Sequence, residues 1–119
     1  NALIAIVDDD TSFRSALETF VRSLGHRVID FDSAEAFLDS GQARAAGVIV
    51  SDIQMPGMSG LELRQHLNSE GIGTEMVLVT ARTEEKYRTQ ARDGGVAHFL
   101  QKPFDPQELA DCIARALAA

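Results

Sequence analysis

The stretch GVIVSDIQMPGMSG, residues 47–60, places a carboxylate directly after an apolar run. The run has the hydrophobic, β-branched character of a strand that is buried on both faces, and it ends at Asp52. Pro and Gly residues then separate Asp52 from Ser59, which forms a helix-capping pattern with Glu62. An acid after a strand usually caps the next helix, but Ser59 is the better cap here. Asp52 is therefore a candidate for chemistry at the end of a strand.

Apolar runs alternate with helical patterns along the whole chain. Helices are indicated by apolar residues spaced three and four positions apart, and strands joined by crossover helices form parallel sheets. The sequence thus predicts one domain over residues 1–119, an α/β fold of (βα)5 type with a doubly wound five-stranded parallel sheet. A common strand order at this size is 2-1-3-4-5. The predicted strands are 3–7, 27–31, 47–50, 76–79 and 96–100.

Capping residues mark where the helices begin and end. Asp10 is expected to cap the first helix, whose apolar stripe runs from Phe13 to Leu24 before Gly25. The stretch TEEKYRTQARDGG (83–95) predicts a fourth, weaker helix, with acids in its first turn and Gly94 at its end. The starts of the second, third and fifth helices show the capping-box pattern of a short polar residue three positions before Glu, in DSAE (32–35), SGLE (59–62) and DPQE (105–108).

Composition narrows the functional classes. The chain has 119 residues, 45% of them hydrophobic, which is typical of a globular domain. A formal charge of −7 disfavours direct binding of nucleic acid or of an anionic membrane. The single cysteine excludes an internal disulfide, and neither a signal peptide nor a membrane-spanning segment is visible. We therefore expect a cytoplasmic soluble domain, and Asn1 in place of Met suggests an excised or processed segment.

Polar residues follow four of the predicted strands, and ligands of open α/β sheets bind beyond those strand ends. Asp8, Asp9 and Asp52 should meet where the strand order reverses, with Thr80 and Lys102 beside them. Carboxylates that converge in this way repel one another unless a cation intervenes, and their oxygens suit Mg²⁺, with Mn²⁺ as a substitute. A carboxylate can also attack phosphorus, and the transferring phosphoryl oxygens then need cations and donors.

Two other functions fit parts of this pattern. A Mg²⁺-dependent phosphohydrolase with an aspartyl nucleophile would need a substrate cap and a second general acid, for which the chain has little room. A nucleotide- or flavin-binding module of the same fold would need a phosphate loop after the first strand. The sequence DDDTSF (8–13) stands there instead and would repel phosphate.

Four segments of the chain resemble the motif blocks of the response-regulator receiver domain, the CheY-like family of bacterial two-component signal transduction. In chain order they are IVDDD, SDIQMPGMSG, LVTA and QKPF, and the resemblance covers essentially the whole chain. The resemblance implies that Asp52 accepts a phosphoryl group from a sensor histidine kinase or phosphotransfer protein. It implies that Asp9, Asp52 and the backbone carbonyl of Gln54 bind Mg²⁺ directly, while Asp8 holds a metal-bound water. Catalysis beyond self-phosphorylation and autodephosphorylation is not expected.

The resemblance also implies a switch. Thr80 and Lys102 would contact the phosphoryl oxygens, Phe99 would be the switch aromatic, and Gln54 and Arg82 would influence phosphoryl lifetime. The peptide bond between Lys102 and Pro103 is commonly cis in the family. Phe99 stands where many members carry Tyr, and Gln101 stands where a charged residue is frequent.

The predicted output surface comprises the fourth helix, the fifth strand and the fifth helix. Its mixed charges suit binding of an effector domain or protein. They also suit a phosphorylation-dependent homodimer in which Arg88 or Arg92 meets Asp111. The alternative is that the charges simply face solvent. The sequence leaves open the cognate kinase, the output pathway, the phosphoryl lifetime and the oligomeric state, and equally whether the parent is a transcription factor, a hybrid kinase or a free-standing regulator.

Overall fold

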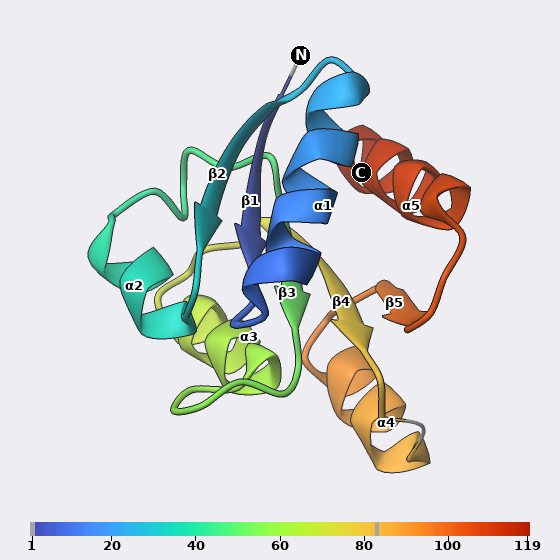
Figure 1. Cartoon of the computed structure of the whole chain (residues 1–119). Coiled ribbons are helices and arrows are strands. Elements are labelled where there is room, and N and C mark those ends of the chain that lie inside the picture. Colours follow the sequence, from blue (N-terminus) through green and yellow to red (C-terminus); the bar gives the residue numbers. More distant parts are fainter. Residues whose placement is uncertain (1, 83) are drawn as a thin grey trace.

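A parallel sheet of five strands in the order β2-β1-β3-β4-β5 forms the centre of the fold (Figure 1). The computed structural model describes residues 2–82 and 84–119. Both the (βα)5 architecture and the predicted strand order are confirmed. The strands are β1 (Leu3–Val7), β2 (Arg27–Phe31), β3 (Val48–Asp52), β4 (Glu75–Thr80) and β5 (His98–Gln101).

Helices cover both faces of the sheet, with two on one face and three on the other (Figure 1). Helices α1 and α5 share a hydrophobic cluster on the first face, and α2, α3 and α4 contribute to the cluster on the second face. The helices are α1 (Thr11–Ser23), α2 (Ala34–Asp39), α3 (Gly60–Ser69), α4 (Glu85–Asp93) and α5 (Pro106–Ala118).

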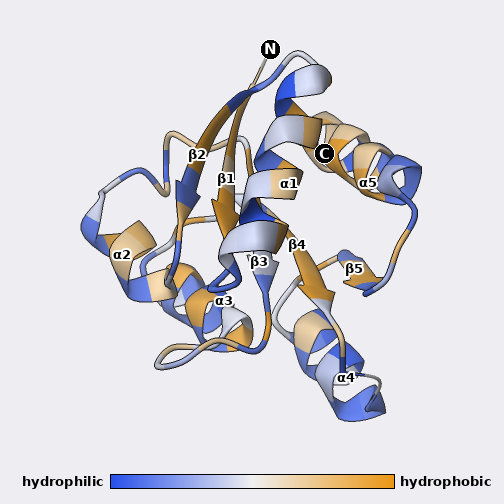
Figure 2. Ribbon diagram, viewed as in Figure 1, coloured by the Kyte–Doolittle hydropathy of each residue, from blue (hydrophilic) through white to orange (hydrophobic). Residues whose placement is uncertain are grey.

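The central strands are apolar on both faces because each face is covered by helices. In β1, Ile4 and Ile6 pack toward α1 and α5, whereas Ala5 and Val7 pack toward the α2–α4 side. Figure 2 shows hydrophobic strands inside helices whose outward faces are hydrophilic. This arrangement explains the continuous apolar runs of the sequence, and it leaves the carboxyl ends of the strands as the place where polar groups gather.

The predicted caps hold at most helix starts. The Asp10 side chain accepts the N–H of Phe13, Gly25 after α1 has φ +92°, and both Ser59 and Asp105 form complete capping boxes. The prediction for α2 is wrong.

Ser33, not Asp32, caps α2 and accepts the N–H of Ala36 at 3.0 Å. No capping box forms at α2, because the Glu35 carboxylate is engaged elsewhere. It accepts a hydrogen bond from the N–H of Met58 in another loop.

Several element boundaries differ from those predicted. Strand β3 continues through Ser51 to Asp52, because both residues still pair with β4. Strand β5 begins at His98 rather than at Val96, because the N–H of Val96 donates to the carbonyl of Ala91 and closes the turn after α4. Helix α4 is shorter than the predicted 83–95, and Thr83 lies outside the described residues.

Candidate functional site

Three carboxylates meet at the carboxyl ends of β1 and β3, as predicted. Asp8 and Asp9 follow β1, Asp52 ends β3, and the two strands are neighbours in the sheet. One carboxylate oxygen from each of the three lies within 4.8 Å of the others. Asp8 and Asp52 are 1% and 8% exposed, whereas Asp9 is open to solvent. A set of three carboxylates with one exposed member matches the oxygen ligands and retained waters that Mg²⁺ prefers.

Contacts with Ser51 and Gln54 hold Asp52 in position. The Ser51 hydroxyl donates to the Asp52 carbonyl at 3.0 Å, and the N–H of Gln54 donates to Oδ1 of Asp52 at 3.2 Å. At the start of α3, a Cβ on Gly60 would overlap the Asp52 carbonyl oxygen, so only glycine fits there. The outer oxygen Oδ2 of Asp52 is thus left facing the acidic cluster and Lys102.

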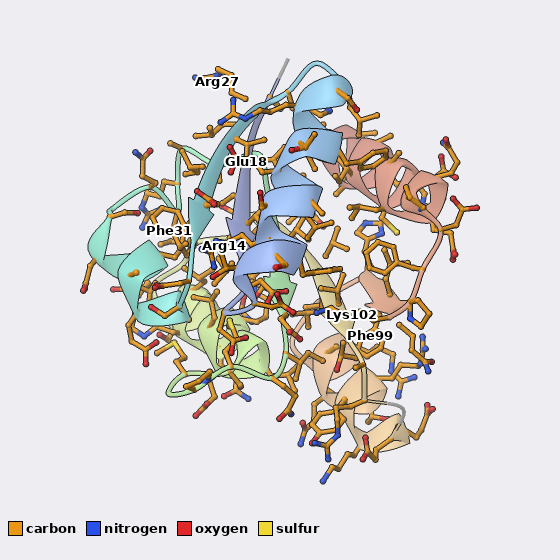
Figure 3. The ribbon with its side chains drawn as sticks, viewed as in Figure 1. Arg14, Glu18, Arg27, Phe31, Phe99 and Lys102 are labelled. Atoms are coloured by element: carbon orange, nitrogen blue, oxygen red, sulfur yellow. The ribbon has the colours of Figure 1, made fainter. Side chains whose placement is uncertain are left out.

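Lys102 supplies the positive charge of the site. Its Nζ lies 3.3 Å from Oδ2 of Asp8 and 3.2 Å from Oδ2 of Asp52, and 3.9 Å from the ring centre of Phe13. Figure 3 shows Lys102 near Phe99, beside the carboxyl ends of the strands. Its backbone N–H donates to the Thr80 carbonyl at 2.7 Å, and the peptide bond between Lys102 and Pro103 is cis. The ammonium group therefore lies close to both buried acids. The backbone of Lys102 is held by β4, and its ammonium group contacts Phe13 of α1.

The electrostatics of the site centre on Asp8. Burial raises the pKa of its carboxyl above the ordinary value, and the charge of Asp52 adds to the increase. The N–H of Asp10, which donates to Asp8 at 2.9 Å, and the ammonium group of Lys102 act in the opposite direction. Because the increase prevails, Asp8 lacks full compensation from the protein alone, and a cation would supply it.

Thr80 and Phe99 lie on adjacent strands behind this cluster. Thr80 is fully buried at the end of β4, and its hydroxyl oxygen accepts the N–H of Arg82 at 3.0 Å. Phe99 is half-buried, and the guanidinium of Arg88 in α4 lies 4.6 Å from its ring centre. The Arg82 side chain pairs with Glu84 at 3.1 Å and shares the exposed β4–α4 connection with it. Thr80 and Phe99 therefore lie on the strands beside the site, and among the interactions of the described residues neither bonds to Asp52. Lys102 is the switch residue that does.

Two residues of α1 belong to the site although the sequence did not single them out. Phe13 lies under the Lys102 ammonium and packs edge-on against Phe104, 6.2 Å away, beside an apolar hollow of about 250 Å³. Arg14 donates to the Asp8 carbonyl at 2.7 Å and pairs with Asp30 at 3.2 Å. Both residues lie in the first turn of α1, after the Asp10 cap. Because α1 begins at the carboxyl end of β1, their position could have indicated from the sequence that they lie near the site.

A family model described as the response regulator receiver domain matches residues 4–114. The chain belongs to this family. It is a receiver domain of two-component response regulators, a family whose role is mainly signalling rather than catalysis. Receiver domains of response regulators interact with histidine kinases and with effector domains.

Similar proteins support this assignment. The transcriptional regulatory protein FixJ of Azorhizobium caulinodans is 36% identical over 96% of this chain, and nodulation protein W of Bradyrhizobium diazoefficiens is 34% identical over 97%. The matches cover 54% and 51% of those proteins, so the chain spans about half the length of these relatives. The crystal structure named FixJ-N is 31% identical, covers 99% of this chain and 94% of that one, and superposes with a TM-score of 0.91.

Proposed function

We propose that Asp52 accepts a phosphoryl group from a phosphohistidine of a sensor kinase or phosphotransfer protein, in a Mg²⁺-dependent reaction. The observation that carries the proposal is the position of Asp52. It is the acid at the end of a central strand, its Oδ1 is held by Gln54, and its Oδ2 faces Lys102. A bond would form between a carboxylate oxygen of Asp52 and phosphorus, the phosphorus–nitrogen bond of the donor would break, and the electron pair would leave with the imidazole nitrogen.

We propose Asp8, Asp9, Asp52 and the backbone carbonyl of Gln54 as the groups that hold the metal. The donor set is all oxygen and negatively charged, which suits Mg²⁺ and admits Mn²⁺. Bound Mg²⁺ neutralises charge on the carboxylates and on the phosphoryl oxygens. Lys102 provides a second cation from the protein itself, and the buried hydroxyl of Thr80, which accepts the N–H of Arg82, still has its own proton to donate.

The output surface of the proposal is formed by α4, β5 and α5. Helix α4 carries exposed charges of both signs and buries only Ala91 fully, and its N-cap residue Glu84 forms no side-chain capping hydrogen bond. A helix with so few buried contacts is easily repositioned. Thr80 and Phe99 lie on β4 and β5 next to it, so Asp52 phosphorylation would reach this surface first, with Gln54 and Arg82 influencing its duration.

We propose this surface as the contact for an effector domain or protein, or for a second copy of the chain. In a two-fold dimer, Arg88 or Arg92 of one copy would meet Asp111 of the other. Arg88 would first have to leave the ring of Phe99. Sedimentation of the phosphorylated protein should show a salt-sensitive mass increase that Arg92→Glu weakens, while a monomer under all conditions would leave only the effector role.

We further propose that residues 1–119 act as one receiver domain in the cytoplasm, without direct binding of nucleic acid or membrane. Among residues 2–82 and 84–119, none of the helices is long and apolar enough to cross a membrane. The net charge of −7 also disfavours anionic partners such as nucleic acid.

The fate of the phosphoryl group tests the proposal. Incubation with acetyl phosphate and Mg²⁺ should give a single base-labile phosphoryl group that stays on the protein long enough to be isolated, and chelation of the metal should prevent it. Rapid release of inorganic phosphate from many small phosphate esters, with no phosphoprotein, would instead indicate a hydrolase and contradict the proposal.

A further inference from the structure

Glu35 in α2 contacts the loop that follows Asp52, far away in sequence. Its carboxylate accepts the N–H of Met58 at 2.9 Å, across 23 positions of the chain. The same carboxylate fills the space that a side chain at Gly57 would need, and Gly57 has φ +76°. The left-handed backbone favours glycine there, and a larger side chain would also displace the Glu35 carboxylate from its present position. The loop conformation and the Glu35 side chain fit each other.

The loop is held at both of its ends. At the near end, the N–H of Gln54 donates to Oδ1 of Asp52, and at the far end the N–H of Met58 donates to Glu35. Between them, the half-buried side chains of Met55 and Met58 pack against the cluster formed by α2 and α3. A displacement of the far end would therefore move the Gln54 N–H that orients the Asp52 carboxylate.

The hydrogen bond of Glu35 is charge-assisted. The Glu35 carboxyl is ionised at neutral pH, and the N–H of Met58 lowers its pKa further below the ordinary value. Hydrogen bonds to ionised acceptors are stronger than those between neutral groups. The anchor therefore persists under the conditions in which Mg²⁺ binds carboxylates.

We propose that Glu35 is a positioning residue for Asp52: by anchoring Met58, it fixes the loop whose Gln54 orients the Asp52 carboxylate, and it thereby tunes metal affinity and phosphoryl lifetime. The inference rests on the proposed function of Asp52. It adds a residue of α2 that lies outside the acidic cluster and outside the switch residues.

The test compares three variants with the unaltered protein. Glu35→Ala removes the anchor, Glu35→Gln removes the charge but keeps an oxygen that can accept the bond, and Asp39→Ala removes an exposed acid from the other end of α2. Amide hydrogen exchange in the metal-free protein reports the anchor at Met58, and calorimetric titration reports the dissociation constant for Mg²⁺. Because Glu35 is exposed, its substitution should leave the fold intact, and circular dichroism of each variant checks this.

We expect Glu35→Ala to speed exchange at Met58 and Gln54 and to weaken Mg²⁺ binding, each by about three- to tenfold, the scale of one lost hydrogen bond. Glu35→Gln should recover part of both effects, because a neutral oxygen accepts a weaker bond, and Asp39→Ala should match the unaltered protein. Equal weakening by Asp39→Ala would show a general charge effect and overturn the inference, as would unchanged binding in Glu35→Ala. If the unaltered protein takes up phosphoryl at Asp52 while Glu35→Ala is indistinguishable from it, only the role of Glu35 fails.

Discussion

The ammonium group of Lys102 lies 3.2 Å from Oδ2 of Asp52, although the two residues are 50 positions apart. The same ammonium reaches Asp8 at 3.3 Å, so one cation serves two buried acids. A third acid, Asp9, stands in the same cluster without this contact among the described residues. The site therefore carries more negative charge than the protein neutralises, and this imbalance is the physical basis of the predictions below.

Loss of the internal cation should destabilise the metal-free protein. In Lys102→Met, two carboxylates lose charge-assisted hydrogen bonds, worth about 1.5–3 kcal/mol in comparable cases. The free energy of unfolding, measured with urea in the presence of a chelator, should fall by an amount on that order. The loss should shrink when Mg²⁺ is added. Equal stability of the variant and the unaltered protein without metal would mean that Lys102 contributes nothing to the balance of charge.

Removal of Asp9 should abolish stabilisation by Mg²⁺. A ligand that binds only the folded state adds about 2.7 kcal/mol at a hundredfold excess over its dissociation constant. Asp9→Ala should lose the resulting rise in melting temperature and keep its stability without metal, because Asp9 is exposed. Asp10→Ala is the matched control, since it should cost about 0.5–2 kcal/mol as a lost helix cap and retain the Mg²⁺ response. An unaltered response in Asp9→Ala would place the metal elsewhere.

Stability of the metal-free protein should depend on pH through Asp8. Its folded-state pKa is raised above the ordinary carboxyl value of 3.8, so folding favours the protonated form. The penalty of ionising Asp8 is absent below pH 3.8 and grows as the pH rises from there through the raised folded-state pKa.

Asp8→Asn should therefore be more stable than the unaltered protein at neutral pH, and the difference should vanish in acid. Thermal unfolding of both proteins from pH 3 to pH 7 checks this. A variant that is less stable at neutral pH would reverse the sign of the effect and contradict it.

Thr80→Ala should separate phosphorylation from switching. Two charge-assisted bonds, from Thr80 and Lys102 to the phosphoryl group, could together shift a conformational equilibrium by about 3–6 kcal/mol. A change from 1:99 to 99:1 requires about 5.5 kcal/mol, so the loss of either bond should leave the switch incomplete. The variant should take up phosphoryl normally, yet amide spectra of α4 and β5 should show only part of the change. A full change in the variant would remove Thr80 from the switch.

The fold was predictable because hydrophobic runs and caps agree with one another. The Ser59 and Asp105 capping boxes follow from local sequence patterns, and the gathering of Asp8, Asp9 and Asp52 follows from strand ends that share one edge of the sheet. The strand order was predicted only as a common one for a chain of this size, and it is the order found. Strand β3 extended farther than its apolar run because backbone pairing with β4 does not require apolar side chains.

The sequence could not predict contacts between side chains that are far apart along the chain. The capping pattern assigned Glu35 to its own helix, whereas a tertiary hydrogen bond to Met58 prevails. Phe13 was interpreted as one more residue of an apolar stripe, and only the packed structure shows that Lys102 lies over its ring. Arg64 gave no signal at all, yet it is buried and holds the α3–β4 connection through the carbonyls of Ile72 and Thr74.

The most direct test of the central claim is the intact mass of the protein after treatment with acetyl phosphate and Mg²⁺. Asp52 is nearly buried and is the acid whose Oδ2 is held by Lys102 at the end of β3, so it should be the single acceptor. The account predicts one added phosphoryl group in the unaltered protein and none in Asp52→Asn, with Asp10→Asn behaving like the unaltered protein. A phosphoryl group on Asp52→Asn would contradict the account.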